Sequence, residues 1–179
     1  MKTRRPVQLL ALTILAGVLA LPASVAEARF TRRNAFITVA FDGDCEQIIA
    51  NQIQSARREL LIAIYSMTSQ RLEDLVVRAA QRGVTVRMKY DAGQAAHASM
   101  QRVIARFEEA GIECVPISLR RSRASMHHKF IVVDGLRVVT GSANFSQMAA
   151  DSNFENCVLI ENQQVARDFA DVFESIEDR

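Results

Sequence analysis

Residues 126–156 read MHHKFIVVDGLRVVTGSANFSQMAADSNFEN and contain two of the three histidines of the chain. Two apolar runs in this stretch, KFIVVD and RVVTG, are separated by a turn at Gly135, so we expect them to form an antiparallel β-hairpin. His127 and Lys129 are two residues apart, and on an extended strand they point to the same face. An imidazole beside an ammonium group favours an anion between them, and phosphate is the natural candidate.

The spacing is His-x-Lys, four residues, Asp, six residues, and then Gly-Ser-x-Asn. It resembles the HKD motif of the phospholipase D superfamily at every defining position, which are His127, Lys129, Asp134, Gly141, Ser142 and Asn144. The turn at residues 65–68, Tyr-Ser-Met-Thr, is similar to the Tyr-Ser-aromatic-Thr turn of single-motif bacterial nucleases of that superfamily, and Met67 is the one departure. The resemblance extends over residues 36–176.

This resemblance implies hydrolysis of phosphodiesters without a metal or cofactor, with His127 as nucleophile and a covalent phosphohistidine intermediate. It implies that Lys129 and Asn144 bind the non-bridging oxygens of the phosphate. Ser142, at the exit of the hairpin, is expected to hydrogen-bond the phosphate or the opposing site. In the similar nucleases an acidic residue just after the motif accepts a hydrogen bond from the catalytic imidazole, and Glu155 occupies that place here.

Three other residues of this stretch have different expected roles. Asp134 lies five residues beyond Lys129, so on a straight strand it points to the opposite face, and we expect it to hold the hairpin rather than to touch phosphate. Gly141 is also expected to be structural. His128 points away from the face of His127, and we expect it to be buried and hydrogen-bonded rather than catalytic.

The rest of the chain alternates between two patterns. Apolar or β-branched runs indicate strands at residues 36–41, 60–65, 84–90 and 112–117. Amphipathic spacing indicates helices at residues 45–59, 70–82 and 94–110. This order is typical of βαβ units on a parallel sheet, and the hairpin, a strand at 156–161 and a helix at 162–177 follow it. We predict an α/β fold with a mixed, largely parallel sheet flanked by helices on both faces, as in phospholipase D-like proteins, in a single domain over residues 29–179.

Residues 1–28 differ from the remainder. They combine a basic start, an apolar run at residues 9–21 and a series of small residues, which is the pattern of a signal peptide cleaved after Ala26 or Ala28. The alternative is a retained membrane anchor, but the run is short for a span of roughly 20 residues. We therefore expect a periplasmic or secreted protein.

The net charge depends on this leader. The full chain carries 22 Lys and Arg and 20 Asp and Glu, and residues 1–28 hold three of the former and one of the latter, so the remainder has no net charge. A globally basic nucleic-acid binder is thereby excluded. A local cluster, Arg120, Arg121 and Arg123, precedes His127 and is expected to steer a nucleic-acid backbone, although surface loops carry similar clusters.

The three cysteines are Cys45, Cys114 and Cys157, and none belongs to a Cys-x-x-Cys pair, so a structural zinc site is not expected. Two alternatives stay open. Cys114 and Cys157 fall on predicted strands and could be neighbours in a disulfide of an exported protein. Otherwise all three are small buried thiols.

The chemistry implied by the motif requires two histidines, one as nucleophile and one as general acid for the leaving oxygen, and the chain has one motif. Two copies paired about a two-fold axis would supply both, so we predict a homodimer with one composite active site. The predicted function is that of an exported endonuclease acting on DNA, with RNA as an open alternative. A phospholipase or phosphatidyltransferase, membrane-tethered if the leader is retained, is the second hypothesis, and a nucleic-acid-binding protein without turnover is the third.

Overall fold

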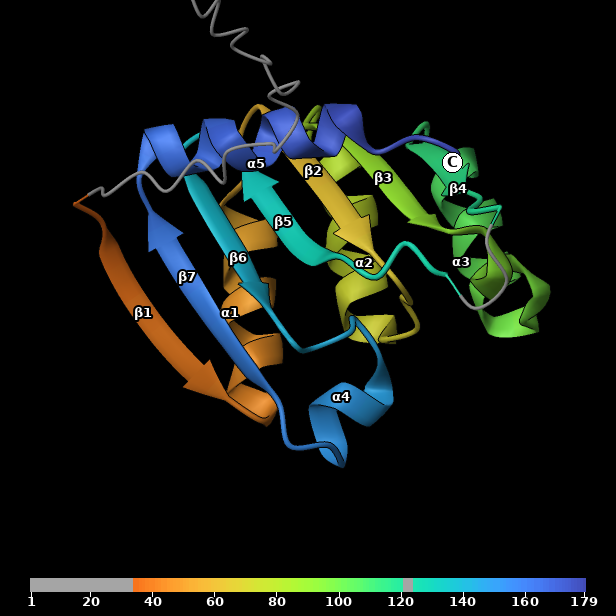
Figure 1. The fold of residues 1–179 in the computed structure, drawn as a ribbon, viewed down its shortest axis with the longest axis horizontal. Coiled ribbons are helices and arrows are strands. Elements are labelled where there is room, and N and C mark those ends of the chain that lie inside the picture. Colours follow the sequence, from red (N-terminus) through yellow and green to blue (C-terminus); the bar gives the residue numbers. More distant parts are fainter. Residues whose placement is uncertain (1–33, 121–123) are drawn as a thin grey trace, which may run out of the picture. The chain divides into compact units, whose positions relative to one another are not determined.

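The computed structural model describes residues 34–120 and 124–179. The predicted leader, residues 1–28, and two of the predicted steering arginines, Arg121 and Arg123, lie outside the described residues. The described part of the chain alternates strands and helices from β1 to α5 (Figure 1). None of the helices in these two ranges combines the length and the apolar character that a membrane crossing requires.

The described residues build a seven-stranded mixed sheet. Its strands lie in the order β1 (Phe36–Phe41), β7 (Asn156–Glu161), β6 (Arg137–Gly141), β5 (Lys129–Val133), β2 (Glu59–Ile64), β3 (Thr85–Asp91) and β4 (Glu113–Ile117). The pairs β2–β3 and β3–β4 are parallel, and the other four neighbouring pairs are antiparallel. Among these strands only β5 and β7 run against the common direction (Figure 1). The predicted fold class is confirmed. Most strands point the same way, although most neighbouring pairs are antiparallel.

Helices cover both faces of the sheet, as predicted. Helices α1 (Gly43–Ser55) and α2 (Gln70–Gln81) lie behind the sheet in Figure 1, and α5 (Gln163–Ser175) packs on the opposite face. A 3₁₀ turn, η1 (Ala92–Ala96), precedes α3 (Ala98–Glu109), which contacts β4. The short helix α4 (Gln147–Asp151) was not predicted, because one turn of helix is too short to show a periodic pattern.

The two central strands explain why the fold needs both layers of helices. Strand β2 is buried along almost its whole length, as its continuous apolar run predicts. The side chains of β5 alternate between the layers, so that Ile131 and Val133 join the core under α1, whereas Phe130 and Val132 join the core under α5. The hairpin of β5 and β6 thus lies between β2 and β7 in the sheet.

Asp134 anchors the far end of β5. Its Oδ1 accepts hydrogen bonds from the backbone N–H groups of Arg57, Arg58 and Glu59, at 3.1, 2.8 and 3.2 Å. Its backbone adopts a positive φ of 56°, which begins the turn to β6. One carboxylate therefore ties the hairpin to the segment that enters β2, and this is a structural role of the kind expected for Asp134.

Cys114 and Cys157 lie on strands, as predicted, but they are not close enough to form a disulfide. Cys114 is on β4 and Cys157 is on β7, which are separated by four strands, so these two are not neighbours. Cys45 of α1 instead lies beside Cys157, and its Sγ donates to the carbonyl oxygen of Ala40, the strand partner of Cys157. All three cysteines are free thiols, and Cys45 and Cys157 are buried.

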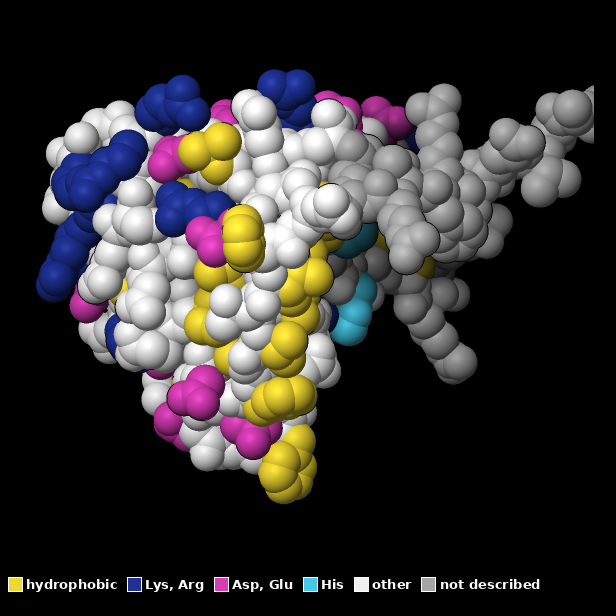
Figure 2. Space-filling view, turned by 90° about the vertical axis from the view of Figure 1, so that its left-hand side faces the viewer, with side chains coloured by type: hydrophobic (Ala, Val, Ile, Leu, Met, Phe, Trp, Pro, Cys, Tyr) yellow, Lys and Arg dark blue, Asp and Glu magenta, His cyan; other side chains and the backbone are white. Residues whose placement is uncertain are grey.

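Strand β1 leaves large apolar side chains on the surface. Phe36, Ile37, Val39 and Phe41 are more than half exposed, and Phe154, just before β7, is 97% exposed. Figure 2 shows apolar side chains gathered in a stripe that runs down this side of the molecule. Soluble monomers seldom expose so many neighbouring apolar side chains, so this side is a candidate contact surface.

The anchor at Asp134 leads to a prediction about acid stability. Burial alone would raise the pKa of Asp134, but the three backbone N–H groups and Arg137 outweigh it, and the pKa is lowered. Because the carboxyl group binds protons more weakly in the folded than in the unfolded chain, its contribution to stability is present above the unfolded pKa of about 3.9 and is lost as the pH falls through the lower, folded value.

Asp134→Asn should lower the free energy of unfolding at pH 7 by about 1–3 kcal/mol, because the amide replaces an acceptor of charge-assisted bonds with a partial donor. The difference from wild type should shrink below about pH 4. Urea unfolding at pH 7 and pH 3 measures both effects, with the exposed Asp171→Asn as control. A difference that stays constant between the two pH values would contradict the role assigned to the carboxylate.

Candidate active site

The motif residues meet at one edge of the sheet. Strands β5 and β7 run opposite to β6, so the beginnings of β5 and β7 and the end of β6 lie together. The end of β2, followed by Tyr65, reaches the same edge because Ile64 pairs with Lys129. This edge collects the side chains that the sequence singled out for chemistry, which are His127, Lys129, Ser142, Asn144 and Glu155.

His127 and Lys129 form the centre of the site. The Nζ atom of Lys129 lies 3.2 Å from both Nδ1 and Nε2 of His127 and 3.3 Å from the His127 carbonyl oxygen. Tyr65 backs both groups, with its ring centroid 4.9 Å from that of the imidazole and 5.4 Å from Nζ. The imidazole is exposed, whereas Lys129 is only 9% exposed. The exposed His127 ring therefore lies against the ammonium group of a nearly buried lysine.

The environment of Lys129 favours an anion. Burial lowers the pKa of its ammonium group, and the negative charge of Glu155 partly offsets that effect. A lowered pKa means that the charged form has lost more hydration than its neighbours replace. A phosphate oxygen bound to Nζ would supply the missing negative charge at a fixed position.

Ser142 and Glu155 form a second unit at the same edge. The Ser142 hydroxyl donates to Oε2 of Glu155 and accepts from the backbone N–H of Asn156 at 3.1 Å. Oε1 of Glu155 accepts from Nδ2 of Asn153 at 3.1 Å. The bond predicted between Glu155 and His127 is not formed within the described chain, because these partners hold the carboxylate at β7 while His127 precedes β5, on the other side of β6.

Asn144 belongs to the loop between β6 and α4. It is half-buried, and its Oδ1 has no hydrogen-bond partner among the described residues. The loop that carries it is fixed to the turn after β2, since the N–H groups of Thr68 and Ser69 donate to the Phe145 carbonyl oxygen at 2.7 and 2.9 Å. The backbone at Asn144 is therefore held in place through its neighbour.

The arrangement suits attack on a bound phosphate. An exposed imidazole can act as nucleophile, and a desolvated ammonium beside it can hold the anionic oxygens. No three His, Cys, Asp or Glu side chains in residues 34–120 and 124–179 are grouped so that they could hold a metal ion.

Comparison with known proteins identifies the family. Residues 49–177 match the family described as cardiolipin synthase, PLD-like domain. The chain belongs to the phospholipase D superfamily. It is 28% identical over 125 residues to a phospholipase D of Rickettsia conorii and 31% identical over 124 residues to a mitochondrial cardiolipin hydrolase of Chlamydomonas reinhardtii. These matches cover 70% and 69% of this chain but only 60% and 53% of the relatives, which are longer.

Two solved structures share the fold over most of this chain. Nuc from Salmonella typhimurium, a phospholipase D family member, superimposes with a TM-score of 0.73 at 25% identity, over 80% of this chain and 94% of Nuc. NucT from Helicobacter pylori has the same TM-score at 20% identity, over 80% of this chain and 96% of NucT. The predicted likeness to the Nuc type of phospholipase D is thus confirmed.

Two residues of the phospholipase D motif, Asp134 and Gly141, have structural roles in this chain. Asp134 is separated from Lys129 by the length of β5, about 17 Å at 3.3 Å per residue, and accepts its hydrogen bonds at the opposite edge of the sheet. Gly141 lies where β6 meets β7, and a Cβ atom there would come within 2.7 Å of the Cys157 Cα and still closer to the Asn156 carbonyl oxygen. Any side chain at this position would push β7 away.

The structure also corrects the expectation for His128. This residue is exposed rather than buried, and among the described residues its ring contacts Phe130 edge-on, with centroids 5.5 Å apart, instead of forming a hydrogen bond. Burial of part of the ring and the nearby Lys129 charge lower its pKa. The alternation of β5 does place it on the face opposite to His127, as predicted, but a cavity keeps that face open.

Two other outcomes concern residues around the site. Arg120 is exposed and its backbone N–H donates to the main-chain oxygen of Arg179, which joins residue 120 to residue 179. The steering role of Arg120 stays a prediction. Tyr65 was quoted only as part of the family-like turn, yet it supports both His127 and Lys129. Its position directly after a buried central strand was the available signal.

Gly141→Ala should lower the free energy of unfolding by about 1–3 kcal/mol and reduce activity, because the added methyl group displaces the start of β7 and with it Glu155. Gly43→Ala is the matched control, since its Cβ would meet a single carbonyl oxygen at 3.2 Å. Thermal unfolding and phosphodiester hydrolysis measure the two effects. Wild-type stability in Gly141→Ala would show that the two strands can separate without cost.

Proposed function

We propose that the protein is a metal-independent phosphodiesterase that cleaves nucleic acid, and that it acts as a homodimer with one composite active site. The observation that carries the proposal is the pairing of an exposed His127 imidazole with the Lys129 ammonium group, 3.2 Å from both ring nitrogens. A phosphate bound to Lys129 would lie directly against the nucleophile.

The chemistry proceeds in two steps. The neutral imidazole of His127 attacks phosphorus, the bond to the leaving oxygen breaks, and that oxygen takes a proton from a general acid. Water then attacks the phosphohistidine, passes its proton to the group that acted as acid, and releases His127. Lys129 holds the non-bridging oxygens throughout, and the Asn144 amide adds a hydrogen bond to them.

A second copy of the chain supplies the general acid. Within the described residues His127 is the one histidine whose ring contacts Nζ of Lys129, since the His128 ring packs on Phe130 and His97 precedes α3. A two-fold axis beside the site edge would bring in His127 of the partner subunit. The exposed Met148 and Phe154 adjoin this edge and suit such an interface. Glu155, which does not reach the imidazole of its own chain, would be available to orient the imidazole of the partner subunit.

Nucleic acid is the preferred substrate because the chain resembles single-motif bacterial nucleases and matches Nuc over 94% of that chain's length. A lipid phosphodiesterase is the second candidate. It is favoured by the exposed apolar stripe of β1 and by relatives that are named phospholipase D and mitochondrial cardiolipin hydrolase.

Purified protein should nick plasmid DNA in excess EDTA, and His127→Ala should lower the rate by about 10³-fold or more, because it removes the nucleophile. The exposed His97→Ala is the matched control. The same samples are tested on vesicles of phosphatidylcholine and of cardiolipin. Loss of activity with EDTA would contradict the metal-independent mechanism, and hydrolysis of lipid without DNA would favour the second candidate.

Mixed dimers test the composite site. When wild type and His127→Ala are refolded together, a site that needs both imidazoles gives an activity proportional to the square of the wild-type fraction. Independent sites give a linear dependence instead. Sedimentation of each sample checks that dimers form, and the pH–rate profile should be bell-shaped, because one imidazole must be neutral and the other protonated.

A further inference from the structure

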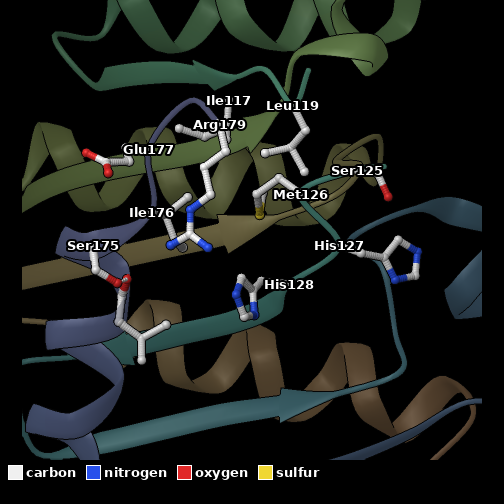
Figure 3. Close-up of a pocket in the computed structure, with 11 residues that line it drawn as sticks. Ile117, Leu119, Ser125, Met126, His127, His128, Ser175, Ile176, Glu177 and Arg179 are labelled. Atoms are coloured by element: carbon white, nitrogen blue, oxygen red, sulfur yellow. Dashed lines mark hydrogen bonds between the residues drawn. The ribbon is translucent and has the colours of Figure 1, made fainter. Parts of the chain in front are cut away.

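A cavity of about 520 Å³ lies next to the catalytic pair and has no part in the chemistry above. It is formed by the end of α5 and the residues after it, by Ile117 and Leu119 at the end of β4, and by residues 125–128 before β5 (Figure 3). His127 stands at one rim, and His128, the next residue, belongs to the same lining. The cavity lies on the side toward which His128 points, and the His127 ring at its rim lies against Lys129.

The walls of this cavity are held by hydrogen bonds. The N–H of Arg179 donates to the Ser118 carbonyl oxygen at 3.1 Å, and the N–H of Ser118 donates to Oδ1 of Asp178 at 2.8 Å. Nζ of Lys89 donates to the carbonyl oxygens of Phe173 and Ile176, at 2.8 and 3.0 Å, and so fixes the end of α5. The cavity is therefore preformed, as ligand pockets commonly are.

The lining combines an apolar wall with a cationic group. The apolar side chains are Ile117, Leu119, Met126, Val172 and Ile176. Figure 3 shows the Arg179 side chain reaching into the cavity toward His128, whereas the Glu177 carboxylate points away from both. No ion pair engages the Arg179 guanidinium group among residues 34–120 and 124–179. A free guanidinium over an apolar wall fits a phosphate attached to a flat, largely apolar group.

We infer that this cavity binds the nucleoside next to the scissile phosphate, and that Arg179 and His128 bind the following phosphate of the strand. The inference rests on the proposed nuclease function. It gives the path of the bound nucleic-acid strand, which would cross the beginning of β5 from Lys129 to Arg179. The volume is within the usual range for small-ligand pockets. An acyl chain in the same place would leave the guanidinium and the imidazole desolvated without partners, which is unfavourable.

The test compares three substrates with different numbers of phosphates. Bis(p-nitrophenyl) phosphate and the dinucleotide TpT each have one phosphodiester, whereas the trinucleotide TpTpT has a second phosphate next to the one that is cut. In Arg179→Gln the ratio of kcat/KM for TpTpT to that for bis(p-nitrophenyl) phosphate should fall about tenfold, the effect of losing one charge-assisted contact of roughly 1.4 kcal/mol. Arg179→Lys should recover part of the ratio, and the control Arg167→Gln, exposed on α5 outside the cavity, should keep it.

The possible outcomes distinguish a failure of the cavity assignment from a failure of the proposed nuclease function. An unchanged ratio in Arg179→Gln, or an equal loss on all three substrates, overturns the assignment of the cavity while the nuclease function stands. A wild type that hydrolyses bis(p-nitrophenyl) phosphate but neither oligonucleotide overturns the nuclease function itself. If Arg179→Gln instead loses activity selectively on cardiolipin, which has two phosphates, relative to phosphatidylglycerol, and not on TpTpT, the second phosphate belongs to a lipid and the nucleotide assignment is wrong.

Discussion

The burial of Lys129, a residue only 9% exposed, is the constraint on which the site depends. Taking such a charge out of water is costly, and within the described residues polar ring atoms, a carbonyl oxygen, the face of Tyr65 and the charge of Glu155 offset part of that cost. The surrounding sheet must therefore be rigid enough to hold the group in place. A bound phosphate would restore to Lys129 the electrostatic stabilisation that its charge lost on burial. The same interaction would therefore favour both binding and catalysis.

That rigidity comes from the opposite end of the same strand. Strand β5 is only five residues long, and its two ends have different tasks. Three backbone N–H groups fix it through Asp134 at one end, and the reactive side chains are presented at the other. Because β5 lies between β6 and β2 and packs against both helical layers, it cannot slide by one residue without exchanging the two sets of core side chains.

The sequence was sufficient for most of the fold, because strand and helix periods, the Gly135 turn and the motif spacing are local properties. It was insufficient wherever two distant segments meet. Nothing local indicates that β1 pairs with β7, that Cys45 lies beside Cys157, or that Ser142 holds Glu155 away from His127. His128 was misjudged for a related reason, since strand alternation gives the face on which a residue lies but not whether that face is covered.

The tight contact at Gly141 bears on how such chains are recognised. Gly141 is required because β6 and β7 lie unusually close, and Ser142 joins the two strands through its hydroxyl. The proposed cleavage depends instead on His127 and Lys129. A descendant that kept the Gly-Ser pair and lost His127 and Lys129 would still fold and would still resemble its relatives. Such a protein would have the fold of the enzyme without its chemistry, and the identity of two side chains would be enough to tell the two apart.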